Sequence, residues 1–175
     1  LTDTLAVGLV QLLSGALGET VNLERIPASN TVAGALHVAQ ATPDGHTLLF
    51  AGNPTITIFP SLYRELPFNP HKDLAPVALF ARMPVALIAA SDNPAKTARQ
   101  VIERARLMPG KINYAALGDG STAHLLGEWF RASGGAEMVH VNYNGSVAAI
   151  NAVATHNVEL GFVPLASALP FLNGG

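Results

Sequence analysis

The sequence predicts an α/β fold with mostly parallel sheets. From residue 111 to residue 172, short apolar runs that suit strands alternate with amphipathic stretches that suit helices. Such alternation is typical of βαβ units, whose strands run parallel to one another. Apolar residues make up 49% of the 175 residues, so the chain can bury a core without the help of disulfides.

The first half of the chain predicts a less regular set of elements. Leucines at three- and four-residue spacings between residues 5 and 17 predict a helix that ends near Gly18. Strands are expected at 21–26, 46–51 and 75–80, with a loop at 27–30 and a helix at 32–42. The proline-rich stretch 58–73 is expected to be a loop with at most one short helix.

The second half of the chain is more regular. Strands are expected at 85–90, 111–117, 138–143 and 158–163, and helices at 97–107, 121–133, 146–156 and 165–172. A bend at 82–84, around Pro84, is expected to join two domains, 1–84 and 85–175.

Ligands of parallel sheets bind beyond the carboxyl ends of the strands. The segments expected there are 52–55, 118–122, 143–146 and 163–167, and none of them carries Lys or Arg. In the second of these segments, Gly118 and Gly120 permit a tight turn, and Ser121 or Thr122 can cap the following helix. Backbone N–H groups would then converge at the positive end of a helix, which is a site for a carboxylate or a phosphate.

Other interpretations of this turn are weaker. Its letters also satisfy Gly-x-Gly-x-x-Ala, but a dinucleotide site needs an acid at the end of the next strand, and Glu137 precedes that strand. Ser121 and His124 suggest acyl transfer, yet no Gly-x-Ser-x-Gly elbow is present, so we expect His124 to be packed or hydrogen-bonded near the turn. The six histidines show no metal-ligand spacing, so neither a metal nor a cofactor is expected.

Composition argues against several kinds of partner. The formal net charge of −2 gives no electrostatic footprint for nucleic acid or for an anionic membrane surface. No uninterrupted apolar run of about 18 residues is present, so no direct membrane insertion is expected. The chain has no cysteine, and no signal peptide is visible at its N-terminus.

Several motifs, in order along the chain, resemble those of one known family. They lie at 43–49, 59–63, 66–77, 109–114, 118–124 and 139–143. Together they look like the tripartite tricarboxylate transporter receptor family, also called Bug solute-binding proteins. The resemblance spans nearly the whole chain, and several ordered motifs are more specific than one glycine loop.

The resemblance implies a two-lobed periplasmic-binding-protein-like (type II) fold with an incomplete first lobe, because both ends of the family pattern are missing. It implies a periplasmic receptor, not an enzyme, that binds a small carboxylated solute and passes it to membrane permease subunits. The ligand contacts that it implies are Gly52, Asn53, Pro54 and Thr55 in the first lobe and Gly118, Gly120, Ser121, Thr122 and Tyr143 in the second.

The chain departs from the family pattern near these contacts. Asp119 stands where an Asn is usual, Asn144 where a Lys is usual, and three glycines are absent around Ala28. An added acid and a lost Lys both disfavour an anionic solute. This leaves open a second interpretation, in which the chain is a degenerate relative that serves as a sensory or interaction module.

Overall fold

The computed structural model describes residues 2–26 and 31–172, so the loop predicted at 27–30 lies outside the described residues. The chain forms two compact units, Leu1–Ala78 and Leu79–Gly175. Within the described residues, no helix has the length and apolar character needed to cross a membrane.

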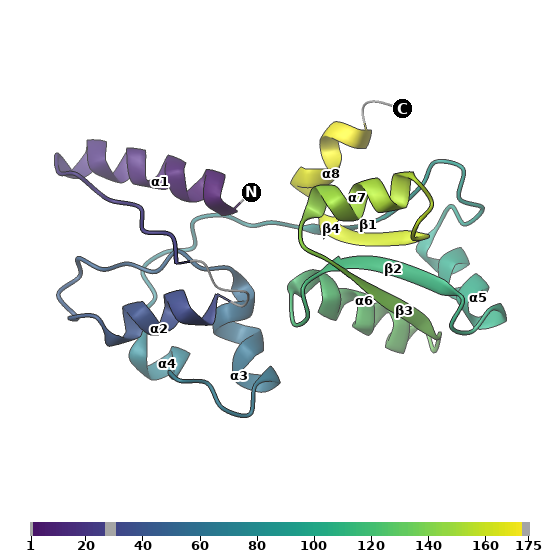
Figure 1. Ribbon diagram of the computed structural model, residues 1–175, viewed down its shortest axis with the longest axis horizontal. Helices are drawn as coiled ribbons and strands as arrows, with labels where there is room; N and C mark the ends of the chain where they lie inside the picture. Colours follow the sequence, from purple (N-terminus) through teal and green to yellow (C-terminus); the bar gives the residue numbers. More distant parts are fainter. Residues whose placement is uncertain (1, 27–30, 173–175) are drawn as a thin grey trace. The chain divides into compact units, whose positions relative to one another are not determined.

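The first unit is built of helices and extended chain (Figure 1). Its helices are α1 (Thr2–Leu17), α2 (Val32–Gln40), the π-helical turn η1 (Pro54–Ile58), α3 (Phe59–Leu62) and α4 (Pro70–Asp73). The helices predicted at 5–17 and 32–42 are confirmed. The stretch 58–73 holds two short α-helices, one more than its proline content suggested.

The strands predicted at 21–26, 46–51 and 75–80 are wrong. These segments are irregular or extended, and they pair with no strand among the described residues. A strand exists only with a hydrogen-bonded neighbour, so an alternating apolar pattern cannot form one alone. The core of this unit is correspondingly small, and Leu12 and Leu17 of α1 are exposed.

The second unit is a four-stranded sheet with helices on both faces (Figure 1). Its strands are β1 (Val85–Ala89), β2 (Ile112–Leu117), β3 (Met138–Tyr143) and β4 (Leu160–Pro164), in the order β1-β4-β2-β3. β2 runs parallel to β3 and β4, whereas β1 is antiparallel to β4. The predicted mostly parallel α/β sheet is therefore confirmed for this unit, with one antiparallel edge strand.

The helices of this unit are α5 (Ala98–Leu107), α6 (Thr122–Ser133), α7 (Ser146–Ala154) and α8 (Leu165–Leu172). α5 and α6 cover one face of the sheet and α7 and α8 cover the other (Figure 1). Residues of β2 alternate between the two cores, with Tyr114 in the first and Ala115 in the second. Both faces of β2 are therefore buried, which explains why all of its residues except Asn113 are apolar.

Helix α6 approaches the sheet closely at one glycine. A Cβ placed on Gly127 would lie 2.3 Å from Cε2 of Tyr114, which is fully buried. The hydroxyl of Tyr114 donates a hydrogen bond of 2.7 Å to Glu128 on the same helix. These contacts fix the position of α6, and with it the glycine turn that precedes the helix.

Candidate functional site

The glycine turn between β2 and α6 has the conformation that its sequence predicts. Gly120 has a φ of +78°, a left-handed value that suits glycine. The amide of Ser121 donates to the carbonyl of Gly118 at 3.0 Å and closes the turn. Ser121 is the helix cap, because its Oγ accepts from the amide of His124 at 3.1 Å and donates to the carbonyl of Leu117 at 2.6 Å.

Two amide groups of this turn remain available to a ligand. The amides of Thr122 and Ala123 belong to the first turn of α6 and donate to no acceptor among the described residues. The amide of Gly120 is occupied, because it donates to Nδ1 of His124 at 3.1 Å. The free donors lie at the positive end of a helix of 12 residues, where an anionic group is stabilised.

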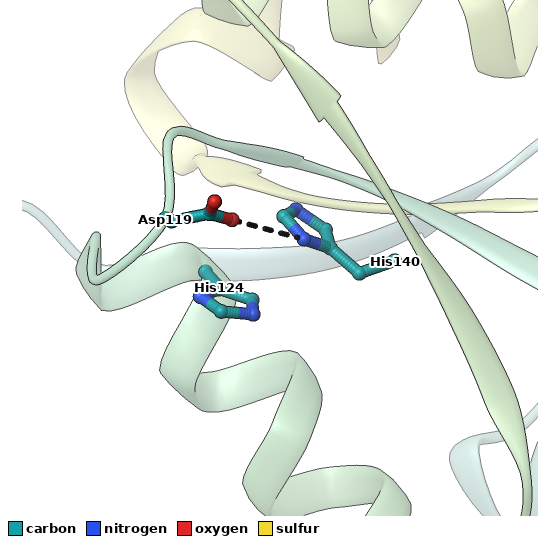
Figure 2. Close-up of side chains that lie close together, drawn as sticks. All are labelled: Asp119, His124 and His140. Atoms are coloured by element: carbon teal, nitrogen blue, oxygen red, sulfur yellow. Dashed lines mark ion pairs between the residues drawn. The ribbon is translucent and has the colours of Figure 1, made fainter.

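Three side chains with titratable groups meet beside the turn (Figure 2). Asp119 comes from the turn itself, His124 from the first turn of α6 and His140 from β3. The carboxylate of Asp119 points toward His140, with Oδ1 3.6 Å from Nδ1. The rings of His124 and His140 are stacked, with their centroids 4.2 Å apart. Asp119 is exposed, with 79% of its side chain accessible, whereas 15% of the His140 side chain is accessible.

His140 lies in an environment that disfavours its charged form. Burial lowers its pKa, and nearby His124 lowers it further, while Asp119 and Glu128 act in the opposite direction. Its Nε2 is a buried atom with no hydrogen-bond partner among the described residues. The ring also stacks on Tyr114, with the two ring centroids 5.3 Å apart, so His140 contacts two aromatic rings.

Sequence spacing did not reveal this cluster. His140 lies 21 positions after Asp119, and the two are brought together by the parallel pairing of β2 and β3, in which Tyr114 stands opposite His140. Such a contact leaves no histidine pair three or four residues apart in the sequence. The expectation that His124 is hydrogen-bonded near the turn is confirmed by its bond to Gly120.

Tyr143 ends β3 and pairs with Leu117, so its backbone lies beside the start of the glycine turn. Its side chain packs with the buried cluster of α7 and α8. His140 stacks on Tyr114, which belongs to the cluster on the other face of the sheet. The structure thus brings Tyr143 near the turn through its backbone, while its side chain and that of His140 lie on opposite faces.

In the first unit, the predicted ligand segment 52–55 is not a loop after a strand. Pro54 and Thr55 lie inside η1, and Asn53 is its N-cap. The hydroxyl of Thr55 is buried and hydrogen-bonded to that of Thr31 at 2.7 Å. Oδ1 of Asn53 accepts from the hydroxyl of Thr57 at 2.7 Å, so the side chains of Asn53 and Thr55 are engaged within their own unit.

The geometry gives no support to acyl transfer by Ser121 and His124. The hydroxyl of Ser121 donates to a backbone carbonyl, and Nδ1 of His124 accepts from a backbone amide. A nucleophile needs a base within hydrogen-bond reach of its hydroxyl. The side chains of Ser121 and His124 therefore stabilise the turn through hydrogen bonds to its backbone.

Comparison with known proteins identifies the family. Residues 6–175 match the tripartite tricarboxylate transporter family receptor. A UPF0065 protein of Bordetella pertussis is 32% identical over 175 residues, which is all of this chain and 54% of that protein. This family is one of receptors rather than of enzymes.

Solved structures agree with this match. One, described as a periplasmic transporter, superposes with a TM-score of 0.84 at 33% identity, over 99% of this chain and 58% of that one. An R. palustris protein solved with adipate superposes with a TM-score of 0.83 at 30% identity, over 99% of this chain and 58% of that one. MatC from Rhodopseudomonas palustris, with bound malate, superposes with a TM-score of 0.81 at 27% identity, over 99% of this chain and 59% of that one.

The chain thus spans somewhat more than half the length of the proteins to which it is similar. The match nevertheless runs through both units and includes the glycine turn. The chain belongs to the tripartite tricarboxylate transporter receptor family.

Proposed function

We propose that this chain acts as an extracytoplasmic receptor. It binds a small carboxylated solute and delivers it to the membrane permease of a tripartite tricarboxylate-type transporter. Family membership supports the receptor role. The similar proteins solved with adipate and malate support a dicarboxylate as the class of solute. The similar structure described as a periplasmic transporter supports a periplasmic location.

The observation that carries the proposal is the pair of free amides at the start of α6. Thr122 and Ala123 offer two adjacent N–H donors in a turn that contains no Lys or Arg. Two adjacent donors at a helix N-terminus suit the two oxygens of one carboxylate. The proposed contacts in the second unit are Gly118, Gly120, Ser121, Thr122 and Tyr143, and those in the first unit are Gly52, Asn53, Pro54 and Thr55.

The hydrogen bonds within the glycine turn indicate different roles for these residues. In the proposal, Ser121 shapes the turn as helix cap, because its hydroxyl already has two partners. Thr122 acts through its free amide. The amide of Gly120 becomes a donor to the solute when its hydrogen bond to Nδ1 of His124 breaks.

Asp119 favours a second candidate, an interaction module that has lost its solute. Its exposed carboxylate lies in the same turn as the free amides and adds a negative charge where an anion would bind. The two candidates differ in one measurable property, since only the receptor binds small dicarboxylates in solution.

Isothermal titration calorimetry of the purified protein separates the candidates. We expect adipate or malate to bind with measurable heat. The uncharged diamides of the same acids, which match their length but lack the carboxylates, should not bind. Absence of heat with every small carboxylate tested would refute the receptor proposal and favour the interaction module.

A further inference from the structure

The cluster beside the glycine turn contains three potential metal ligands from three different elements (Figure 2). Each of Asp119, His124 and His140 offers one ligand atom, and these atoms all lie within 4.8 Å of one another. Two imidazoles and one carboxylate are a donor set that suits zinc and related transition metals better than Mg²⁺ or Ca²⁺. We propose that Asp119, His124 and His140 bind a divalent transition-metal ion of the zinc type and leave one coordination position open.

The separations are near those of a coordinated site. Bonds of about 2.0–2.2 Å place the ligand atoms of a tetrahedral ion roughly 3.4 Å apart. Oδ1 of Asp119 and Nδ1 of His140 are already 3.6 Å apart. The site therefore closes through a small movement of Asp119, whose side chain is mostly exposed, and through a rotation of the ring of His124.

The rotation of His124 has a specific consequence. Its ring is now stacked on His140 with an angle of 21° between the planes, so the two rings cannot both direct a lone pair at one ion. When Nδ1 of His124 turns to the ion, it gives up the hydrogen bond from the amide of Gly120. Metal binding thus exchanges one hydrogen bond for a coordination bond and frees a third backbone donor in the turn.

His140 is suited to this role by its surroundings. Its Nδ1 lies 3.6 Å from Oδ1 of Asp119, while its Nε2 has no hydrogen-bond partner among the described residues. Nearby Glu128 is held by Tyr114 and Arg131 and does not compete as a ligand.

The proposed ion also explains why a turn that binds an anion contains the acidic residue Asp119. A divalent cation held by Asp119 reverses the local charge, and its open position accepts an oxygen of a carboxylate. This consequence rests on the proposed receptor function, whereas binding of the metal alone does not.

The test is a calorimetric titration of the purified, tag-free protein with Zn²⁺ alone, repeated with Co²⁺ to record the visible spectrum of a low-coordinate site. We expect one ion per chain. Asp119→Asn and His124→Gln should each weaken binding by about tenfold or more, since changes to the outer shell of metal sites already cost roughly 10–100-fold. Asp92→Asn is the matched control, because Asp92 forms an exposed Asp–His pair with His156 at 3.5 Å that lies outside the cluster.

Absence of Zn²⁺ binding overturns the proposal, and so does binding that Asp119→Asn and His124→Gln leave unchanged or that Asp92→Asn weakens equally. Both cluster variants alter side chains that are not fully buried, and circular dichroism verifies that they fold. Dicarboxylate titrations with and without a chelator separate this inference from the proposed function. Solute binding without metal binding defeats only the metal site, and metal binding without solute binding defeats only the receptor proposal.

Discussion

Nδ1 of His124 accepts a hydrogen bond of 3.1 Å from the backbone amide of Gly120, four residues earlier. The ring therefore occupies a donor that an anionic ligand of the turn would otherwise use. Two donors, the amides of Thr122 and Ala123, remain free at the start of α6 among the described residues. The histidine that follows the turn thus occupies one of its three amide donors and leaves two for a ligand.

Thr122→Pro should weaken dicarboxylate binding by roughly tenfold to a hundredfold, because a hydrogen bond to a charged group contributes about 1.5–3 kcal/mol. Proline removes the amide but is well tolerated at the first position of a helix. The preceding Ser121 already has the extended conformation that a following proline requires, with φ −66° and ψ 157°. Calorimetry with malate measures the loss.

Thr122→Ala is the control for this variant, since it removes the hydroxyl and keeps the amide. We expect binding within about threefold of wild type, because the Thr122 hydroxyl has no hydrogen-bond partner among the described residues and is not fully buried. Equal weakening by Pro and Ala would show that the hydroxyl, and not the amide, holds the solute.

Gly120→Ala should destabilise the protein by about 1–2 kcal/mol, because an L-residue in the left-handed region is strained. Gly120 has a φ of +78° and is buried. Gly118→Ala provides the comparison within the same turn, since a Cβ at Gly118 meets no atom within 4 Å. Urea unfolding should place Gly118→Ala within about 0.5 kcal/mol of wild type. Equal effects of the two substitutions would contradict this account of the turn.

Gly127→Ala should also destabilise, although alanine favours a helix over glycine by about 1 kcal/mol. The added Cβ would lie 2.3 Å from the ring of Tyr114, and overpacking of this kind costs about 1–3 kcal/mol. The ring cannot move away easily, because it is fully buried and its hydroxyl is bonded to Glu128. Thermal unfolding measures the net loss.

Gly8→Ala in α1 isolates the effect of helix propensity. A Cβ at Gly8 meets nothing within 4 Å, so this substitution should be neutral or stabilising. A stabilising Gly127→Ala would mean that α6 does not pack on Tyr114 as described.

Stability should fall as the pH is lowered through the range below about 6.5, the ordinary pKa of histidine. Burial and the neighbouring His124 lower the pKa of His140 in the folded protein, whereas Asp119 and Glu128 oppose this shift. Between the folded and unfolded pKa values the unfolded chain binds more protons, so the free energy of unfolding rises with pH there. Urea unfolding of wild type and His140→Gln across this range should show a smaller slope for the variant. An unchanged slope would assign the pH dependence to other groups.

The second unit was predictable from sequence because its signals are local. Strand and helix periodicities, the cap at Ser121 and the turn at Gly120 depend on neighbouring residues, and each element appears within a few residues of its expected bounds. The strands expected in the first unit were not predictable in the same way. Apolar alternation at 21–26, 46–51 and 75–80 needs a pairing partner, and the described residues supply none.

In the candidate site, too, local features were predictable from the sequence and contacts between distant residues were not. The turn was visible as glycines followed by Ser121, but the contact of Asp119 with His140 depends on strand register, which spacing does not give. The sequence does carry one signal, since His140 and Tyr143 lie three positions apart along β3, an odd step, and must therefore point to opposite faces of the sheet. The buried hydroxyl of Thr55 had no sequence signal, because it depends on contact with Thr31.

The most direct test of the receptor account is the effect of malate or adipate on the backbone amides of the glycine turn. In ¹H–¹⁵N NMR spectra of the purified protein, the account predicts saturable shifts of the Thr122 and Ala123 amides on titration with the diacid and none with its diamide. Saturable binding that leaves these two amides unshifted, or no binding of any dicarboxylate, would contradict it.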